Sequence, residues 1–181
     1  VLVDDNNTVV PKLPVGIYNM CHNDKDGVYL ERIGNKFSLP FEHPNYDEDF
    51  IAHVIKSHGE TNMNMSVMLN DTNGTCKICT AKTIANELNL PVIIIGKMID
   101  HMMEFIKKIQ DSCCFFFDEF EEMCEHHNSD PSKTLQSVLD GVKSGETKHV
   151  LIMTSKNMEL DSSSLSRLGN LLYYKLDVQF P

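Results

Sequence analysis

One lysine follows a polar loop at a spacing that suits phosphate binding. Residues 65–69 are apolar, residues 70–75 are rich in Asn, Asp, Thr and Gly, and apolar residues recur at helical intervals between Ile84 and Leu88. This order predicts a strand, a loop and a helix. In a phosphate-binding P-loop, the backbone N–H groups of such a loop surround a phosphate and a lysine reaches it. Lys77 stands where that motif has its lysine.

The match to the P-loop pattern G-x-x-x-x-G-K-[ST] is partial. Three residues agree with its common form: Gly74, Thr75 and Lys77. Three others depart from it: Asp71 replaces the first glycine, Cys76 the glycine before the lysine, and Ile78 the hydroxyl residue after it. A carboxylate repels a polyanion, a side chain reduces the clearance that glycine gives the backbone, and isoleucine has no oxygen for Mg²⁺. These departures oppose nucleotide binding.

Two carboxylates, Asp118 and Glu119, end a second apolar run. Residues 91–95 and 148–154 are further apolar runs, typical of strands that are buried on both faces, and helical patterns lie between the runs. Alternating strands and helices predict an α/β fold with a parallel sheet. We expect the two carboxylates to face the bend around Lys77 from the tip of the adjacent strand.

With these features the chain resembles the AAA+ ATPase family of P-loop NTPases, from about residue 65 to residue 176, with a degenerate Walker A loop. Five landmarks follow the family's order: the P-loop-like segment, the strand Phe115–Glu119, the L-L-x-x-L-D-G-like segment Leu135–Gly141, the strand end Thr154–Asn157, and the S/N-R-P-G-R-like segment Ser166–Asn170. The resemblance implies a three-layer P-loop NTPase sandwich with a parallel central sheet.

The resemblance also implies roles for the residues of the site, with ATP and Mg²⁺ as the cofactors of a working site. The nucleotide-contacting positions would be Asp71, Gly74, Thr75, Cys76, Lys77 and Ile78. Lys77 would reach the β and γ phosphates, Asp118 would help to hold Mg²⁺, and Glu119 would polarise the attacking water.

Two further landmarks depart from the family pattern. The sensor asparagine falls on Lys156, with Asn157 one residue later. Arg167 keeps the first arginine of the late segment, but the second, which in the family commonly reaches a neighbour's γ-phosphate, is Asn170. Loss of an arginine finger lowers the rate of related reactions by a factor on the order of 10³ to 10⁵.

Five departures therefore affect one reaction path: Asp71, Cys76, Ile78, Lys156 and Asn170. We expect a chain that keeps the fold but has an eroded nucleotide site, binds ATP weakly or not at all, and acts as a structural or regulatory subunit of an assembly. One alternative is an active ATPase that remodels a protein partner. A second is a thiol redox protein, because Cys76 and Cys79 form a C-x-x-C motif at a helix start.

Composition limits the partners. The chain has 181 residues, a net charge of -10 and a pI near 5.2, which disfavours a surface that coats nucleic acid. No apolar run reaches the ~20 residues that span a bilayer. Six cysteines, some inside apolar runs, resemble reduced thiols and favour the cytoplasm. We expect protein partners in a homo- or hetero-oligomer, for which the family's rings are one arrangement.

The chain divides into three parts by composition. Residues 1–14 predict an extended arm, residues 15–46 a small antiparallel β unit with a third strand over Lys36–Leu39, and residues 47–181 an AAA+-like α/β domain without the family's helical lid. Within the last part we expect a helix over residues 97–109 and a polar segment over residues 121–127.

Overall fold

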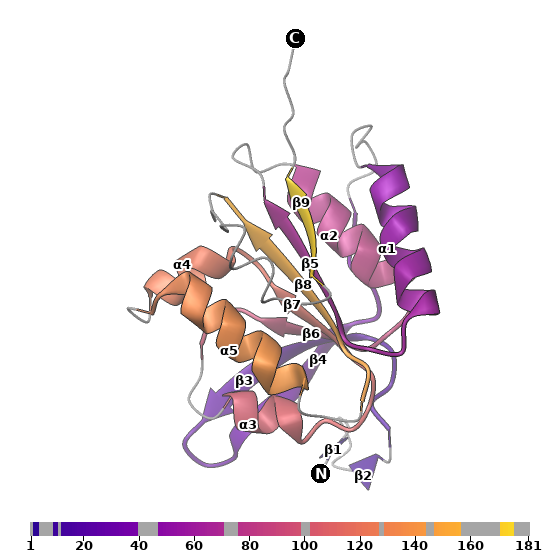
Figure 1. Cartoon of the computed structure of the whole chain (residues 1–181). Coiled ribbons are helices and arrows are strands. Elements are labelled where there is room, and N and C mark those ends of the chain that lie inside the picture. Colours follow the sequence, from indigo (N-terminus) through magenta and orange to yellow (C-terminus); the bar gives the residue numbers. More distant parts are fainter. Residues whose placement is uncertain are drawn as a thin grey trace.

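Seven strands form one mixed sheet, in the order β4-β3-β6-β7-β8-β5-β9 (Figure 1). The computed structural model describes residues 2–3, 9–10, 12–39, 47–70, 76–98, 102–126, 129–143, 147–156 and 171–175. The strands of this sheet are β3 (Ile17–Asn23), β4 (Gly27–Gly34), β5 (Met65–Asn70), β6 (Val92–Ile95), β7 (Cys114–Phe117), β8 (Val150–Ser155) and β9 (Leu171–Lys175). β3 and β4 pair antiparallel, and all other neighbours in the sheet are parallel.

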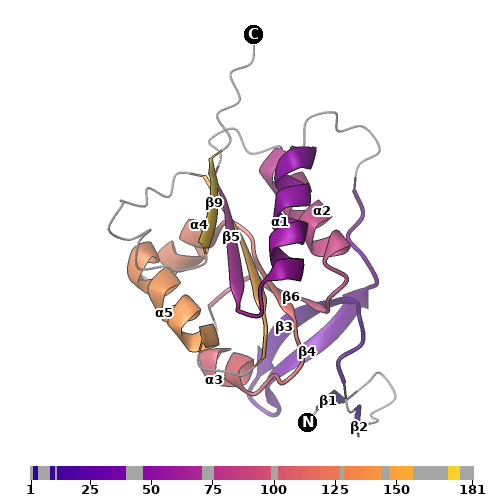
Figure 2. The same cartoon turned by 45° about the vertical axis from the view of Figure 1, so that its right-hand side comes forward.

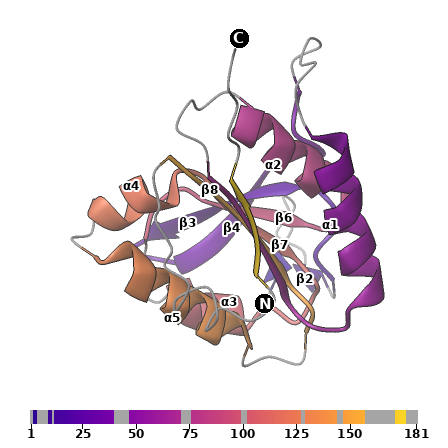
Figure 3. The same cartoon turned by 45° about the horizontal axis from the view of Figure 1, so that its top comes forward.

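Helices cover both faces of the sheet (Figures 2 and 3). On one face lie α1 (Glu48–Glu60) and α2 (Cys76–Glu87), and on the other α3 (Met102–Lys107), α4 (Phe120–Glu125) and α5 (Pro131–Lys143). Within the described ranges, none of the helices is long and apolar enough to cross a bilayer.

The aromatic run of β7 accounts for the two hydrophobic cores. Phe115 and Phe117 pack with buried residues of α3, α4 and α5, whereas Phe116 packs with those of α1 and α2. Successive side chains of a strand point to opposite faces, so one apolar strand contributes to both cores. The predicted three-layer α/β fold of a P-loop NTPase is confirmed.

The expected N-terminal hairpin is present and belongs to the main sheet. Asn23 Oδ1 accepts hydrogen bonds from the backbone N–H groups of Lys25 and Asp26 at 3.0 and 2.7 Å, and Gly27 has a φ of 71°. The Asp-Gly pair therefore forms the predicted turn. β3 continues the sheet by pairing in parallel with β6. A separate antiparallel pair joins β1 (Leu2–Val3) to β2 (Val9–Val10). The division of the chain at residues 14 and 46 stays a prediction.

Two local expectations were wrong, and a third was confirmed only in part. Lys36–Leu39 is not a strand: the Phe37 N–H donates to Asn86 Oδ1 at 2.9 Å, and Asn86 Nδ2 donates to the Phe37 carbonyl at 3.1 Å. The side chain of a helical residue thus takes the place of a neighbouring strand. The helix that we expected over residues 97–109 is confirmed over Met102–Lys107, whereas the described residues 97–98 and 108–109 are not helical. The expected polar segment after Glu119 is the helix α4.

The five cysteines whose side chains the structure describes are free thiols, and four of them are buried: Cys79, Cys113, Cys114 and Cys124. Burial raises the pKa of Cys113 to about 12 and also raises the pKa of Cys114. A buried thiol with a raised pKa is a poor nucleophile because the thiolate is the reactive form. These cysteines therefore contribute mainly to packing.

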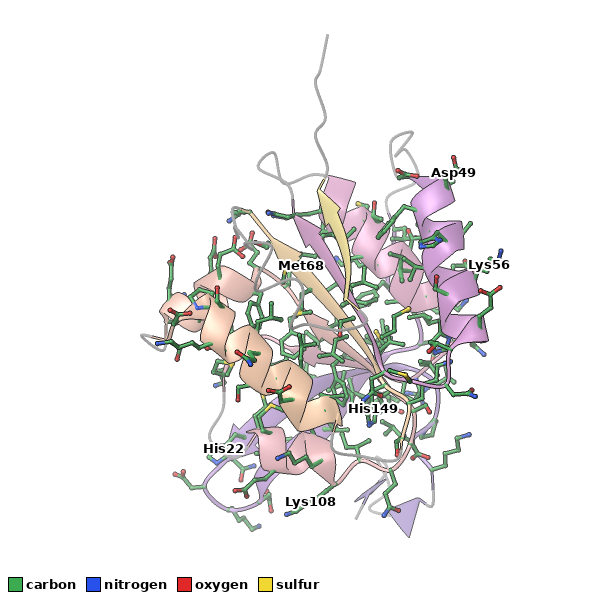
Figure 4. The ribbon with its side chains drawn as sticks, in the orientation of Figure 1. His22, Asp49, Lys56, Met68, Lys108 and His149 are labelled. Atoms are coloured by element: carbon green, nitrogen blue, oxygen red, sulfur yellow. The ribbon has the colours of Figure 1, made fainter. Side chains whose placement is uncertain are left out.

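His149 is buried where β7 and β8 begin (Figure 4). It is 3% exposed, its backbone N–H donates to Asn64 Oδ1 at 2.6 Å, and its Nδ1 accepts from the Cys113 N–H at 3.4 Å. The Phe115 ring lies 5.2 Å away, centroid to centroid. Burial lowers the pKa of His149 below its ordinary value, so the fold favours the neutral imidazole.

Acid should therefore destabilise the fold. Below about pH 6.5 the unfolded chain binds more protons at His149 than the folded chain, because the pKa of His149 is lower in the fold. As the pH is lowered, this group reduces the free energy of unfolding by at most about 1.4 kcal/mol per pH unit, until the pH reaches the pKa of His149 in the folded protein. Chemical denaturation on either side of about pH 6.5 measures this slope.

His149→Asn is the matched variant, because its Oδ1 can accept the same N–H bond but does not titrate. In this variant the free energy of unfolding should depend less steeply on pH than in the wild type. The pKa of His58, also lowered by burial and then by Lys148, adds its own share to wild type and variant alike. Equal slopes for the two proteins would contradict this prediction.

Candidate nucleotide site

The carboxyl ends of three parallel strands lie side by side at one edge of the sheet. β8 lies between β5 and β7, and the register pairs Asn70 with Ser155 and Phe117 with Met153. After β5 the chain continues to β6, which lies on one side of the neighbouring strands β8 and β5. After β8 it continues to β9, which lies on the other side of this pair. In open α/β sheets, ligands bind beyond the carboxyl ends of the strands at such a reversal of strand order.

Lys77 lies in the first turn of α2 and points to the end of β8. It is 2% exposed, and its Nζ donates a hydrogen bond of 2.8 Å to the backbone carbonyl of Ser155. A buried ammonium needs such a partner, because burial of an unpaired charge is costly. The next residue, Ile78, is half-buried and packs against the hydrophobic cluster of α1 and α2. A phosphate at Lys77 would compete with the Ser155 carbonyl.

Thr154 holds the end of β7 in place. Its hydroxyl donates to Asp118 Oδ1 at 2.6 Å and accepts from the Glu119 N–H at 2.9 Å. The register predicts this contact, because the pair after Phe117 and Met153 is Asp118 and Thr154. The threonine is fully buried, so its hydroxyl has no access to water. The Asp118 carboxylate and the Glu119 backbone are therefore both held to β8 by one side chain.

Glu119 has a left-handed backbone, with φ 50° and ψ 57°. This conformation is uncommon for a residue other than glycine and costs on the order of 1–2 kcal/mol. Glu119 alone connects Asp118, the residue after β7, to Phe120, the first residue of α4. The first turn of α4 then brings Glu121 and Glu122 to the same end of the sheet as Glu119.

Lys156, the residue after β8, is bound by three carboxylates. Its Nζ lies 2.8 Å from Glu119 Oε1 and 2.5 Å from Glu122 Oε1, and its backbone N–H donates to Glu121 Oε1. Hydrogen bonds to Glu119 and then to Glu122 raise the pKa of Lys156, and the hydrogen bond from Lys156 is the main cause of the lowered pKa of Glu122. The three side chains in the ion pairs are 37–45% exposed.

The geometry has one chemical consequence for Glu119. A carboxylate can polarise water only with a free lone pair aimed at it, and here Glu119 Oε1 is paired with an ammonium. In this arrangement the Lys156 ammonium therefore occupies one oxygen of the carboxylate that was expected to polarise water.

The predicted residues come together, but not as neighbours on adjacent strands. Asp118 and Glu119 were expected on the strand next to the P-loop strand, yet β8 separates β7 from β5. The two parts of the site meet through β8, since Lys77 contacts Ser155 and Asp118 contacts Thr154. The expectation of an adjacent strand was wrong.

Several predicted positions lie outside the described residues: Asp71, Gly74, Thr75, Asn157, Arg167 and Asn170. Cys76 begins α2, but its side chain is not described. Sequence reasoning missed Thr154 and Ser155 as contacts of Asp118 and Lys77, and missed Glu121 and Glu122 as partners of Lys156. The signal for the two glutamates was their position two and three residues after Glu119, which places them in the first turn of a helix.

The C-x-x-C motif has one described side chain. Cys79 lies on α2 and is 8% exposed. A redox motif needs a thiol that a substrate disulfide can reach. The burial of Cys79 therefore gives no support to the redox alternative.

Residues 67–176 match the family model described as "ATPase family associated with various cellular activities (AAA)". A search of curated proteins gives no match.

Solved structures with a similar fold include two of RuvB from Thermotoga maritima. One of these, a single-residue variant, is 20% identical, with a TM-score of 0.52, and the match covers 72% of this chain and 44% of that one. The structure described as a Holliday junction branch migration motor is 18% identical, with a TM-score of 0.50 and coverage of 72% and 45%. PCH-2 from C. elegans is 16% identical, with a TM-score of 0.47 and coverage of 72% and 43%. The match thus spans less than half of the length of each of these proteins.

Proposed function

This chain belongs to the AAA family of ATPases, and on that premise we propose that it is a member with an eroded nucleotide site, which binds ATP weakly or not at all and serves as a structural or regulatory subunit of an assembly. The observation that carries the proposal is the ion pair of 2.8 Å between Lys156 and Glu119. It pairs the residue expected to polarise water with a cation that the chain itself supplies.

The sequence of the phosphate-binding segment supports the same proposal. Asp71 adds negative charge, Cys76 adds a side chain beside the expected phosphate, and Ile78 gives no oxygen to a metal. Lys77 already donates to the Ser155 carbonyl, so a phosphate at Lys77 would share the ammonium with that carbonyl or compete with it. Each feature weakens binding, and none requires a change of fold.

The fold that remains suits a role in assembly. Members that keep an intact domain without a working site can still present surfaces to partner subunits, and we propose protein partners in a homo- or hetero-oligomer. The net charge of -10 disfavours a nucleic-acid surface. A cytoplasmic location is part of the same proposal and is supported by the free thiols of the described cysteines.

Titration with Mg-ATP tests the proposal directly. We expect a dissociation constant weaker than about 1 mM, equivalent to about −4 kcal/mol, for the wild type and for Lys77→Ala alike. A repaired variant that carries Asp71→Gly, Cys76→Gly and Ile78→Thr is the positive control, and we expect it to bind at least about tenfold more tightly, a change of about 1.4 kcal/mol.

Isothermal titration calorimetry or a fluorescent ATP analogue can measure these constants. Saturable binding by the wild type near or below about 0.1 mM that Lys77→Ala removes would contradict the proposal.

The second candidate is an active ATPase that remodels a protein partner. One observation favours it: Lys77, Asp118 and Glu119 all reach the end of β8, where a nucleotide site of this fold would lie. This candidate requires Glu119 to leave Lys156 during the reaction, which a turnover assay can detect.

A further inference from the structure

The fold family implies a Mg²⁺ ion beside the acidic strand end, and the residues here can be tested for that role. Mg²⁺ requires a nearly octahedral set of oxygen ligands. Of the positions expected to supply them, Ile78 has no oxygen, and Asp118 Oδ1 accepts the Thr154 hydroxyl at 2.6 Å. Glu119 and Glu122 each give an oxygen to Lys156. The donor set does not fit the ion.

The acidic residues of this region do not converge on a common point for a metal. We define the carboxylate cluster as Asp118, Glu119, Glu121 and Glu122. Although it holds four carboxylates, the described residues include no group of three or more His, Cys, Asp or Glu side chains arranged to hold a metal ion. Three of the four carboxylates contact Lys156, through its ammonium or its backbone N–H.

We infer that the Lys156 ammonium is the resident cation of the carboxylate cluster, and that the cluster therefore does not take up Mg²⁺. The ammonium lies between two carboxylate oxygens at 2.8 and 2.5 Å, at ion-pair contact with both. A divalent cation that bound the same oxygens would have to displace Lys156 or lie close to its positive charge. Both outcomes oppose metal binding.

This inference rests on the proposed function for the identity of the site and explains why the metal part of that site is lost. A Lys side chain reaches the cluster from the residue that follows β8, where the family pattern has a polar sensor position. One substitution thus supplies a cation to Glu119 in the absence of any ligand. Nucleotide bound at Lys77 would then bind without dependence on Mg²⁺.

Titration with Mn²⁺ in the absence of nucleotide tests the inference, with free Mn²⁺ followed by electron paramagnetic resonance. We expect Lys156→Met to bind Mn²⁺ at least about tenfold more tightly than the wild type. Adding Glu119→Gln to Lys156→Met should remove this gain, because it deletes one of the freed carboxylates. Lys156→Gln is the second variant, with the same expected gain, in case the methionine variant does not fold.

Lys56→Met is the matched control. Lys56 is exposed on α1 and pairs with Glu60 at 3.9 Å, so its loss frees one carboxylate outside the cluster (Figure 4). We expect no gain in Mn²⁺ affinity from this variant.

Two results would overturn the inference: wild-type Mn²⁺ binding that Glu119→Gln alone weakens tenfold, or no gain in a folded Lys156 variant. The Mn²⁺ titration contains no nucleotide, so its outcome does not depend on ATP binding. Tight ATP binding would therefore refute the proposed function without refuting this inference.

Discussion

Phe117→Ala should lower the free energy of unfolding by about 3–5 kcal/mol. Phe117 is fully buried in the core formed with α3, α4 and α5, and its ring packs edge-on against Phe120 with the centroids 5.9 Å apart. Alanine would lose the transfer energy of the ring and leave a cavity, because the strands on both sides of β7 limit relaxation. The same residue precedes Asp118, so the loss also loosens the acidic strand end.

Urea denaturation followed by circular dichroism measures this change. Phe105→Ala is the control, since Phe105 on α3 is only partly buried and packs at the margin of the same core. We expect Phe105→Ala to lower the free energy of unfolding by less than Phe117→Ala does. A loss below about 1 kcal/mol for Phe117→Ala would show that β7 is not a central strand of this core.

Thr154→Val should cost about 1–3 kcal/mol although the two side chains have nearly the same shape. The hydroxyl that valine lacks donates to Asp118 and accepts from the Glu119 N–H at a fully buried position. Its removal leaves the Glu119 N–H without this acceptor where β7 turns into α4. The left-handed conformation of Glu119 then loses one of the bonds that maintain it.

Thr154→Ser keeps the hydroxyl and should retain most of the stability, apart from the loss of one methyl group. Comparing the two variants by urea denaturation separates the hydrogen bonds from packing. Equal stability of the valine variant and the wild type would mean that Thr154 does not fix the ends of β7 and β8 together.

The strands of this fold were predictable because burial on both faces leaves a simple pattern. β5, β6, β7 and β8 are short apolar runs in the sequence, and each lies within about two residues of its expected limits. The order of the strands was harder to obtain from the sequence. We expected Asp118 beside the P-loop strand, whereas β8 lies between them. Pairing between strands far apart in the chain depends on the packing of whole helices, which local patterns do not encode.

α4 was missed for a local reason. A helix start is usually marked by a side chain that caps the first N–H groups, and Glu119 at the N-cap makes no such bond. Its left-handed backbone also belongs to conformations that sequence patterns associate with glycine or asparagine. The helix follows instead from the buried Phe120, Met123 and Cys124 on one side.

Lys156 shows how far the site itself could be predicted. Its departure from the family pattern was visible in the sequence, and so was the acidic pair that it contacts. The position of Glu121 and Glu122 after Glu119 was visible too, but their contact with Lys156 was not, because it joins the end of β8 to a helix about 35 residues earlier in the chain. The chemical meaning of the substitution depends on that contact.

Phosphate release from Mg-ATP, compared between the wild type and Glu119→Gln, tests the central claim most directly. If Lys156 holds Glu119 as the structure describes, Glu119 does not polarise water, and the two proteins will release phosphate at the same background rate. Faster release by the wild type that Glu119→Gln abolishes would contradict the account.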